Sequence, residues 1–186
     1  RIEKEKILVS PSDLNNFVNC SYHIFNDLRQ NKDGLLKNEA SEDMKLWRKY
    51  GHEHEKKYLD KFKKEYPNNI TIDPKQTDDK RHKDTIEALN KGYDLIYKAF
   101  LIDGDFRGEA DFLIKTKDKT NLGDYGYEVY DAKITKNLKP SHVLQITSYS
   151  YFLSKITGNL SKKMFLIDGS DQIYSFNLKE FIDYFS

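Results

Sequence analysis

Hydrophobic residues in the first half of the chain recur every three or four positions, which is the period of an amphipathic α-helix. The first such segment opens with Ser10 and Pro11, which suit the N-cap and the first turn of a helix, and it ends at the turn 32–34. The second segment carries His54 inside its apolar face and stops before Pro67. We predict helices over 10–31, about 42–66 and 79–90, and a short strand over 70–72.

The period changes to that of extended chain after Gly92. Two strands are expected to form a hairpin around the turn at 103–105, and a third strand precedes a helix that begins at Pro140. Three strands, a helix and returning strands predict an α/β fold with a mixed sheet and additional helices at the N-terminus. The expected elements are strands 95–102, 106–116 and 125–135, helix 140–156, strands 163–167 and 172–176, and the beginning of a helix over 177–185.

The composition fits one domain of this kind. A chain of 186 residues is long enough for one hydrophobic core, and its 13 Tyr, 11 Phe and 1 Trp argue against disorder. Its 31 Lys and Arg nearly balance 30 Asp and Glu, so the net charge of +1 does not predict a protein that coats a polyanion. We expect a single domain over 1–186, and the start at Arg1 rather than Met is consistent with a piece of a longer protein.

The cysteine content and the hydropathy of the chain limit the kinds of site and the cell compartment that we expect. One Cys excludes an internal disulfide framework and a zinc site built on cysteines of this chain. No apolar run approaches the roughly 20 residues of a membrane-spanning helix. The sequence shows no signal peptide, so we expect a cytoplasmic protein.

Acidic and basic side chains meet on two of the expected strands. Alternation along 127–133 puts Asp131 and Lys133 on one face, and Glu109 and Asp111 share a face of the preceding strand. If these strands pair, Asp111 and Asp131 converge beside Lys133. Two carboxylates can hold Mg²⁺ or Mn²⁺, whose bound water then attacks a phosphodiester while the lysine orients that water. The alternative is an exposed ion pair on a solvated face, worth about 0–1 kcal/mol.

Three further side chains have two interpretations each. His54 is either a core histidine or a metal ligand. Gln145 and Tyr149 lie four residues apart on one helix face, where they either pack against neighbours or hold the lysine and a nucleotide.

Several motifs occur in a fixed order, each on the type of element expected for it. They are Ser12-Asp13-Leu14-x-x-Phe17, Gly51-x-x-His54-Glu55, Gly108-x-Ala110-Asp111-Phe112-Leu113, Tyr127-Glu128-Val129-x-Asp131-x-Lys133 and Gln145-x-x-x-Tyr149. Over about residues 8–180 this order resembles the RecB-like nuclease branch of the PD-(D/E)xK phosphodiesterase superfamily. The likeness is greatest to the nuclease domain at the front of larger nuclease–helicase-type proteins, and CRISPR-adaptation exonucleases belong to the same branch.

The resemblance implies a restriction-endonuclease-like core and a metal-dependent deoxyribonuclease. It implies Mg²⁺ or Mn²⁺ as the cofactor, single-stranded or end-containing DNA as the substrate, and a helicase domain in the same or another chain as a partner. The chain departs from the family pattern with Ala110 in place of the proline before the first aspartate. The implied residues are Asp111, Asp131 and His54 as metal ligands, Lys133 to align the attacking water, and Gln145 with Tyr149 to position the lysine and the DNA.

Relatives in this branch often carry a [4Fe–4S] cluster held by one early and three late cysteines. Cys20 occupies the early place, but this sequence has no other Cys, and one thiolate cannot hold a cluster that needs four ligands. An iron–sulfur site therefore requires three cysteines beyond this sequence, and otherwise Cys20 is expected to be a small buried hydrophobe.

Other functions stay open at this point. A catalytically silent nucleic-acid-binding or scaffold module of a helicase-like protein would need no metal, and RNA or small nucleotides are alternative substrates. Basic residues that are candidates for phosphate contacts are Lys61, Lys63, Lys64, Arg81, Lys83, Lys136 and Lys139.

Overall fold

A six-stranded mixed sheet forms the centre of the computed structural model, which describes residues 2–3, 6–34 and 39–184. The strand order is β3-β4-β5-β6-β7-β8. The pairs β3–β4 and β6–β7 are parallel and the other neighbours are antiparallel. The strands are β3 (Asn69–Thr71), β4 (Leu95–Asp103), β5 (Phe106–Thr116), β6 (Gly126–Ala132), β7 (Lys163–Ile167) and β8 (Ile173–Asn177).

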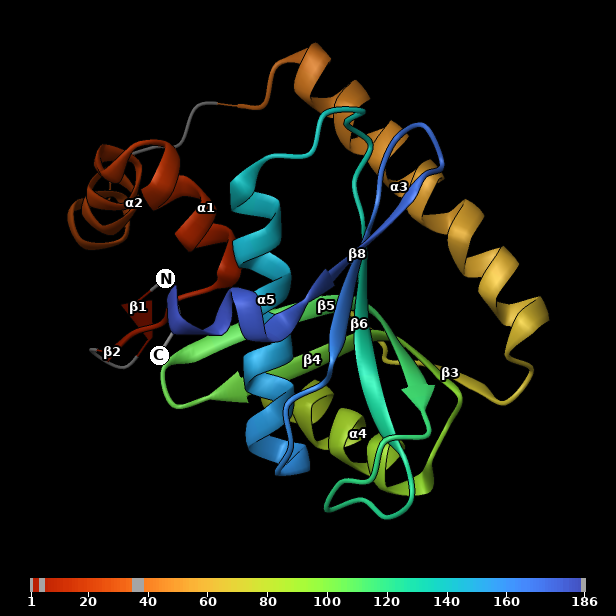
Figure 1. Cartoon of the computed structure of the whole chain (residues 1–186). Coiled ribbons are helices and arrows are strands. Elements are labelled where there is room, and N and C mark those ends of the chain that lie inside the picture. Colours follow the sequence, from red (N-terminus) through yellow and green to blue (C-terminus); the bar gives the residue numbers. More distant parts are fainter. Residues whose placement is uncertain (1, 4–5, 35–38, 185–186) are drawn as a thin grey trace.

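Helices cover both faces of this sheet (Figure 1). The described residues form α1 (Pro11–Asn19), α2 (Ser21–Asp33), α3 (Glu42–Glu65), α4 (Asp78–Lys91) and α5 (Pro140–Thr157), with a separate two-stranded sheet of β1 (Ile2–Glu3) and β2 (Lys6–Ile7). The predicted α/β class with a mixed sheet is confirmed. No helix among the described residues combines the length and the apolar character that a membrane crossing requires.

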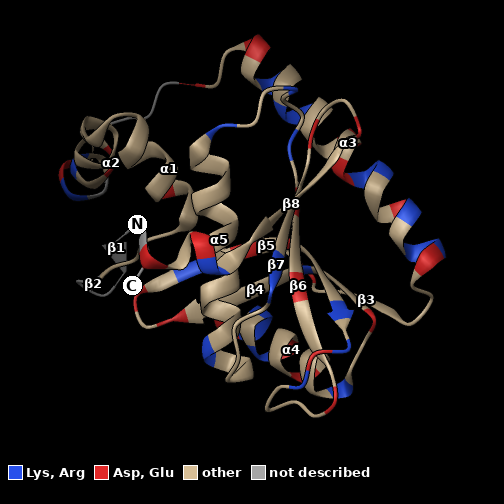
Figure 2. Ribbon diagram, in the orientation of Figure 1, with Lys and Arg blue, Asp and Glu red and all other residues tan. Residues whose placement is uncertain are grey.

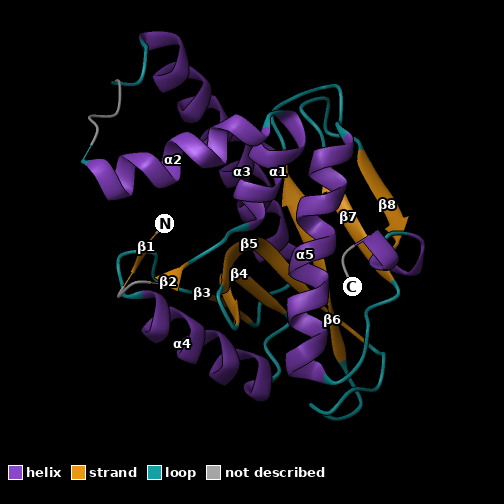
Figure 3. Cartoon of the chain, turned by 90° about the vertical axis from the view of Figure 1, so that its left-hand side faces the viewer, coloured by secondary structure: helices purple, strands orange, loops and turns teal. Residues whose placement is uncertain are grey.

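The sheet has a hydrophobic core on each side. Leu89 of α4 and Phe152 of α5 belong to the larger cluster, and α5 lies in front of the strands in Figure 3. Tyr58 and Phe62 of α3 pack on the opposite face against Phe112. Since α5 connects the parallel strands β6 and β7, its packing also fixes the ends of those strands.

Local signals place the helix ends where they were predicted. Ser10 Oγ accepts the Asp13 N–H at 3.2 Å and Asp13 Oδ2 accepts the Ser10 N–H at 2.7 Å, which is a complete capping box at the start of α1. Gly92 and Gly158 adopt φ values of +69° and +71° and end α4 and α5.

The predicted continuous first helix is wrong. The chain is extended at Cys20, with φ −166° and ψ 111°, so α1 ends there and α2 begins. Cys20 is exposed rather than buried. Phe17 is 56% exposed and Phe25 is 50% exposed, so the apolar face of this segment is not part of the core. Apolar residues at helical spacing predict that a helix has one apolar face, but they do not show whether another element covers that face.

Three other predicted elements differ from the structure in their burial, their end or their type. The apolar face of α3 is buried only in its second half, because Trp47 is 62% exposed whereas Tyr58 is buried. Strand β6 ends at Ala132, earlier than the predicted end at 135. The chain after Asn177 forms two 3-10 turns, Leu178–Glu180 and Ile182–Tyr184, in place of the predicted helix, whose last residue, Phe185, lies outside the described residues.

The in-out alternation of β4 shifts by one residue at Lys98. Ile96 and Ala99 both face the core beneath α4 and α5, although they are three residues apart. Lys98 has a φ of +60°, a left-handed conformation that is rare for residues other than glycine. Ala110 and Leu113 of β5 also share that core, so the alternation shifts in both paired strands at the same level.

Gly108 allows α1 and α5 to pack closely on β5. A Cβ at this position would lie 2.7 Å from Tyr149 Cε1 and 2.9 Å from Pro11 Cδ. We expect Gly108→Ala to lower the free energy of unfolding by about 1–3 kcal/mol, because a ring and a proline must both move. Urea unfolding would measure this change. The control is Gly51→Ala in α3, where a Cβ meets nothing within 4 Å and where we expect a gain of up to about 1 kcal/mol. Equal stability of Gly108→Ala and wild type would contradict the close packing.

The stability of the protein is expected to depend on pH through His142, which lies in the first turn of α5. Its Nδ1 accepts the Lys139 N–H at 3.2 Å, and burial together with the charges of Lys133 and Lys139 lowers its pKa from 6.5 to about 4. The unfolded chain therefore binds this proton more readily, so stability is expected to fall as pH falls from about 6.5 to 4. Urea unfolding at pH 7 and pH 5 tests this. His142→Asn keeps an acceptor that does not titrate, and an equal loss of stability in both proteins would contradict the expectation.

Candidate functional site

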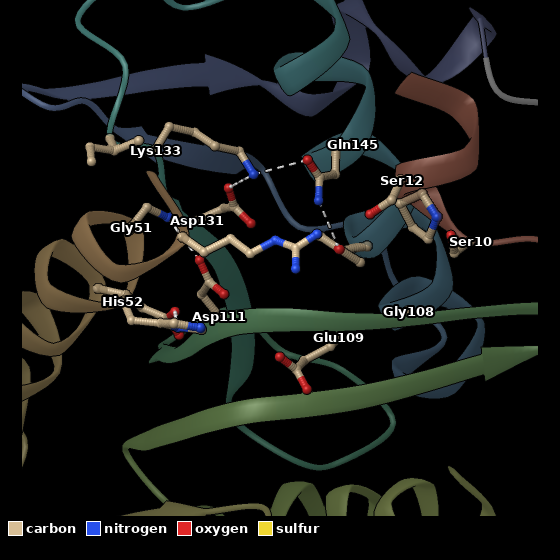
Figure 4. Close-up of a pocket in the computed structure, with 16 residues that line it drawn as sticks. Ser10, Ser12, Gly51, His52, Gly108, Glu109, Asp111, Asp131, Lys133 and Gln145 are labelled. Carbon is tan, nitrogen blue, oxygen red and sulfur yellow. Dashed lines mark hydrogen bonds and ion pairs between the residues drawn. The ribbon is translucent and has the colours of Figure 1, made fainter. Parts of the chain in front are cut away.

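A cavity of about 430 Å³ opens where the ends of β5 and β6 meet α1, α3 and α5 (Figure 4). Most of the residues singled out in the sequence line it, although they come from five separate elements. The lining residues are Ser10, Pro11, Ser12, Arg48, Gly51, His52, Glu55, Gly108, Glu109, Asp111, Asp131, Ala132, Lys133, Ile134, Gln145 and Tyr149.

Asp111 and Asp131 lie at this cavity because β5 and β6 pair. The register places Phe112 opposite Tyr130, so the two aspartates project from adjacent strands. Asp111 Oδ2 accepts the Ala132 N–H at 3.0 Å, which joins the end of β6 to β5. The convergence expected from strand alternation is present in the structure.

Lys133 lies one residue beyond β6 and points into the cavity. Its N–H donates to Ile167 O at 2.7 Å, which fixes its backbone to the end of β7. Its Nζ lies 2.6 Å from Asp131 Oδ2 and donates to Gln145 Oε1 at 2.9 Å (Figure 4). The lysine is therefore held between a carboxylate of the sheet and an amide of α5.

Gln145 and Tyr149 support the lysine from α5. Gln145 Nε2 donates to the Tyr149 hydroxyl at 3.0 Å, and Gln145 Oε1 also accepts from Asn15 Nδ2 at 3.0 Å. Gln145 thus connects α1, α5 and Lys133. Of the two interpretations of this pair, the contacts favour positioning of the lysine.

Burial governs the charge state of the aspartate–lysine pair. Asp131 is 2% exposed, and burial raises its pKa to about 6, with Lys133 opposing and Asp111 adding to the rise. Burial lowers the pKa of Lys133, but the carboxylates of Asp131 and Asp111 outweigh this effect and leave its pKa above the ordinary value. At neutral pH the pair is an ammonium beside a carboxylate.

A second lysine lies among the acidic side chains. Lys98 Nζ lies 3.0 Å from Asp111 Oδ1 and 3.0 Å from Glu109 Oε1, and it forms a close ion pair with Glu55 Oε1. Burial lowers the pKa of Lys98, but these three carboxylates outweigh it, so its pKa lies above the ordinary value. Burial and the charge of Asp111 raise the pKa of Glu55.

His54 does not join Asp111 and Asp131 at the cavity. Its ring contacts that of Tyr58, with centroids 5.3 Å apart, and its buried Nε2 has no hydrogen-bond partner. The helical positions Gly51 and Glu55 face the cavity instead. His54 was predicted as the helix-borne ligand, but the α3 residue of this motif that lines the cavity beside the acidic side chains is the next one, Glu55.

Arg81 is not placed to contact a phosphate. It is 7% exposed, forms a close ion pair with Glu109, and its guanidinium carbon lies 4.3 Å from the centroid of the Phe100 ring. Its guanidinium therefore pairs with Glu109 and is not available to a ligand at the surface.

The donor chemistry of this site fits a hard divalent cation. Glu55 Oε1 and Asp131 Oδ2 are buried and accept no hydrogen bond, although each lies close to an ammonium. Such oxygens are ligands for Mg²⁺ and Mn²⁺. As arranged, however, no group of three or more His, Cys, Asp or Glu side chains within the described ranges is placed to hold one metal ion. A metal would have to replace the contacts that Lys98 now makes.

Lys98 and Glu55, to which the sequence analysis assigned no role, can be linked only to weak sequence signals. Lys98 is a charge inside the apolar run Ile96–Leu101, and such a break in a strand is a common mark of a buried polar contact. Glu55 lies four residues after Gly51, on the face that also holds Arg48. Neither signal reveals which side chains they meet.

The contacts of Gln145 generate a stability prediction. Gln145→Leu leaves the partly buried Lys133 ammonium with one acceptor fewer, so we expect a loss of about 1–3 kcal/mol in urea unfolding. Tyr149→Phe removes one hydrogen bond between neutral groups and is expected to cost about 1 kcal/mol. A larger loss of stability for Tyr149→Phe than for Gln145→Leu would contradict the expectation that the Gln145 amide contributes more to stability than the Tyr149 hydroxyl does.

Comparison with known proteins adds no relative. No protein-family model matches the chain, and no curated protein matches it.

Proposed function

We propose that the chain is a divalent-metal-dependent nuclease domain that hydrolyses DNA phosphodiester bonds. One observation carries this proposal: Asp111, Asp131 and Lys133 meet in one cavity, with Lys133 held by Gln145. The order of motifs that resembles RecB-like nucleases also supports it. An exposed ion pair on a solvated face does not describe this arrangement, because Asp131 is buried.

The chain's own residues account for several parts of such a reaction. A metal held by Asp111, Asp131 and Glu55 would polarise the phosphoryl group and lower the pKa of a bound water. Lys133 would orient the attacking water or offset the negative charge that develops on the phosphoryl oxygens. The water oxygen would attack phosphorus and lose one proton to solvent, the bond between phosphorus and the leaving oxygen would break, and the leaving oxygen would take up one proton from solvent.

Features around the cavity support single-stranded DNA or DNA ends as the substrate. Arg48 and His52 of α3 line one wall, and Ser10 and Ser12 at the start of α1 line the other. Trp47 is exposed on α3, and exposed aromatic rings can stack on unpaired bases. Lys and Arg alternate with Asp and Glu along α3 (Figure 2), so the helix has no uniform basic face and the substrate contacts are expected to be local.

A binding or scaffold module that does not cut DNA is the second candidate function. The ammonium of Lys98 favours it, because it occupies contacts that a metal would need. A helicase domain as a partner fits either function. An iron–sulfur cluster would use Cys20, which is exposed, together with three cysteines from outside this sequence.

Replacement of Lys133 tests the nuclease. We expect purified wild type to cleave end-labelled single-stranded DNA with Mn²⁺ or Mg²⁺ and not with EDTA. Lys133→Ala is expected to lower the rate about 100- to 1,000-fold, since one preorganised group that stabilises developing charge is lost. Gel analysis of the products gives the rate and the polarity of cleavage.

The control is Lys163→Ala, which removes an exposed lysine of β7 and is expected to cleave as wild type does. Cleavage by Lys133→Ala at the wild-type rate would contradict the assignment of this lysine. DNA binding by a folded wild type that neither cleaves DNA nor takes up Mn²⁺ would favour the scaffold.

A further inference from the structure

We propose that Lys98 is an internal cation that occupies the acidic site in the metal-free protein and competes with the divalent ion for the same carboxylates. It is a positioning residue, since it acts through Glu55, Glu109 and Asp111. The inference rests on the proposed function, because it concerns the metal site of that nuclease.

The contacts of Lys98 are those of a bound cation. Its Nζ lies 3.0 Å from both Asp111 Oδ1 and Glu109 Oε1, and it pairs closely with Glu55 Oε1. These carboxylates come from two elements, α3 and β5, so the ammonium lies where the elements converge. Oxygen ligands from several elements around one cation are also what a hard metal requires.

The backbone holds Lys98 in this position. Its φ of +60° is rare for a residue with a side chain, and such conformations persist only where the surrounding structure enforces them. Lys98 and Asp111 lie between the same two register pairs, Tyr97↔Phe112 and Ala99↔Ala110. The shift in alternation therefore places the ammonium beside the aspartate of the neighbouring strand.

The charges of the cluster explain why an internal cation is needed. Four carboxylates, Glu55, Glu109, Asp111 and Asp131, face three cations. Lys133 pairs with Asp131 and Arg81 pairs with Glu109. Without Lys98, Asp111 would have no ion-pair partner among the described residues, and Glu55 would have only the exposed His52 ring, whose Nδ1 lies 3.9 Å from Glu55 Oε2. A divalent ion supplies the charge for both, so it can replace the ammonium.

Direct metal titration separates this proposal from activity. Calorimetry with Mn²⁺ and without DNA would compare wild type with Lys98→Gln and Lys98→Gly. We expect each variant to bind Mn²⁺ at least about tenfold more tightly, since no ammonium has to leave. Mn²⁺ is also expected to raise the melting temperature of each variant more than that of wild type, because the metal-free variants bury uncompensated carboxylates.

Two controls make the test specific. Arg48→Gln removes a positive charge from the wall of the same cavity, and we expect its affinity for Mn²⁺ to change less than about threefold. Asp111→Asn is expected to abolish binding. Lys98→Gly keeps the test valid if Lys98→Gln does not fold, because glycine adopts a φ of +60° readily.

The outcomes distinguish this inference from the proposed function. If wild type binds Mn²⁺ through Asp111 and neither Lys98 variant binds more tightly, Lys98 is no competitor, and the metal site of the proposed function stands. An equal gain in Arg48→Gln would show a general charge effect and overturn the role of Lys98. If no protein in the series binds Mn²⁺, both this inference and the metal-dependent mechanism are wrong.

Discussion

Carboxylates that converge in a space largely removed from water need cations beside them, and this requirement shapes the centre of the protein. Isolated charges are costly to bury, and like charges at close range oppose one another. Lys98, Lys133 and Arg81 meet this requirement by pairing with the acidic side chains of β5, β6 and α3. Each cation comes from a different part of the chain, so the cluster exists only when the sheet and the helices are assembled.

The sheet is adapted to that cluster. Regular alternation along β4 would keep Lys98 in phase with Ile96, which faces the core beneath α4 and α5. The left-handed residue at 98 shifts the phase, and β5 follows at the same level. Each face of the sheet thus keeps its own apolar cluster, although charged side chains meet at this level of β4 and β5. A backbone conformation of this kind at a site of converging charge is typical of functional positions.

The helices on the two faces of the sheet contribute different residues to the cavity. Helix α5 is packed into the larger core and holds Lys133 through Gln145, while Asn15 of α1 joins the same amide. Helix α3 is anchored by Tyr58 and Phe62 and presents Glu55 to the acidic cluster. The first half of α3, unlike the half that Tyr58 and Phe62 anchor, leaves Trp47 exposed.

The sequence by itself determined the α/β class and most element boundaries, because these follow from periodicity and capping residues. Strand alternation also predicted that Asp111, Asp131 and Lys133 meet if their strands pair, and the tertiary structure decided that pairing. It did not determine which helix residue faces the acids, and His54 was expected where Glu55 lies. It also did not show that Cys20 interrupts a helix or that Lys98 enters the cluster. The place of Glu55 depends on the rotation of α3 over the sheet, and the place of Lys98 depends on a phase shift shared by two strands. Both result from packing between distant segments, which local patterns do not encode.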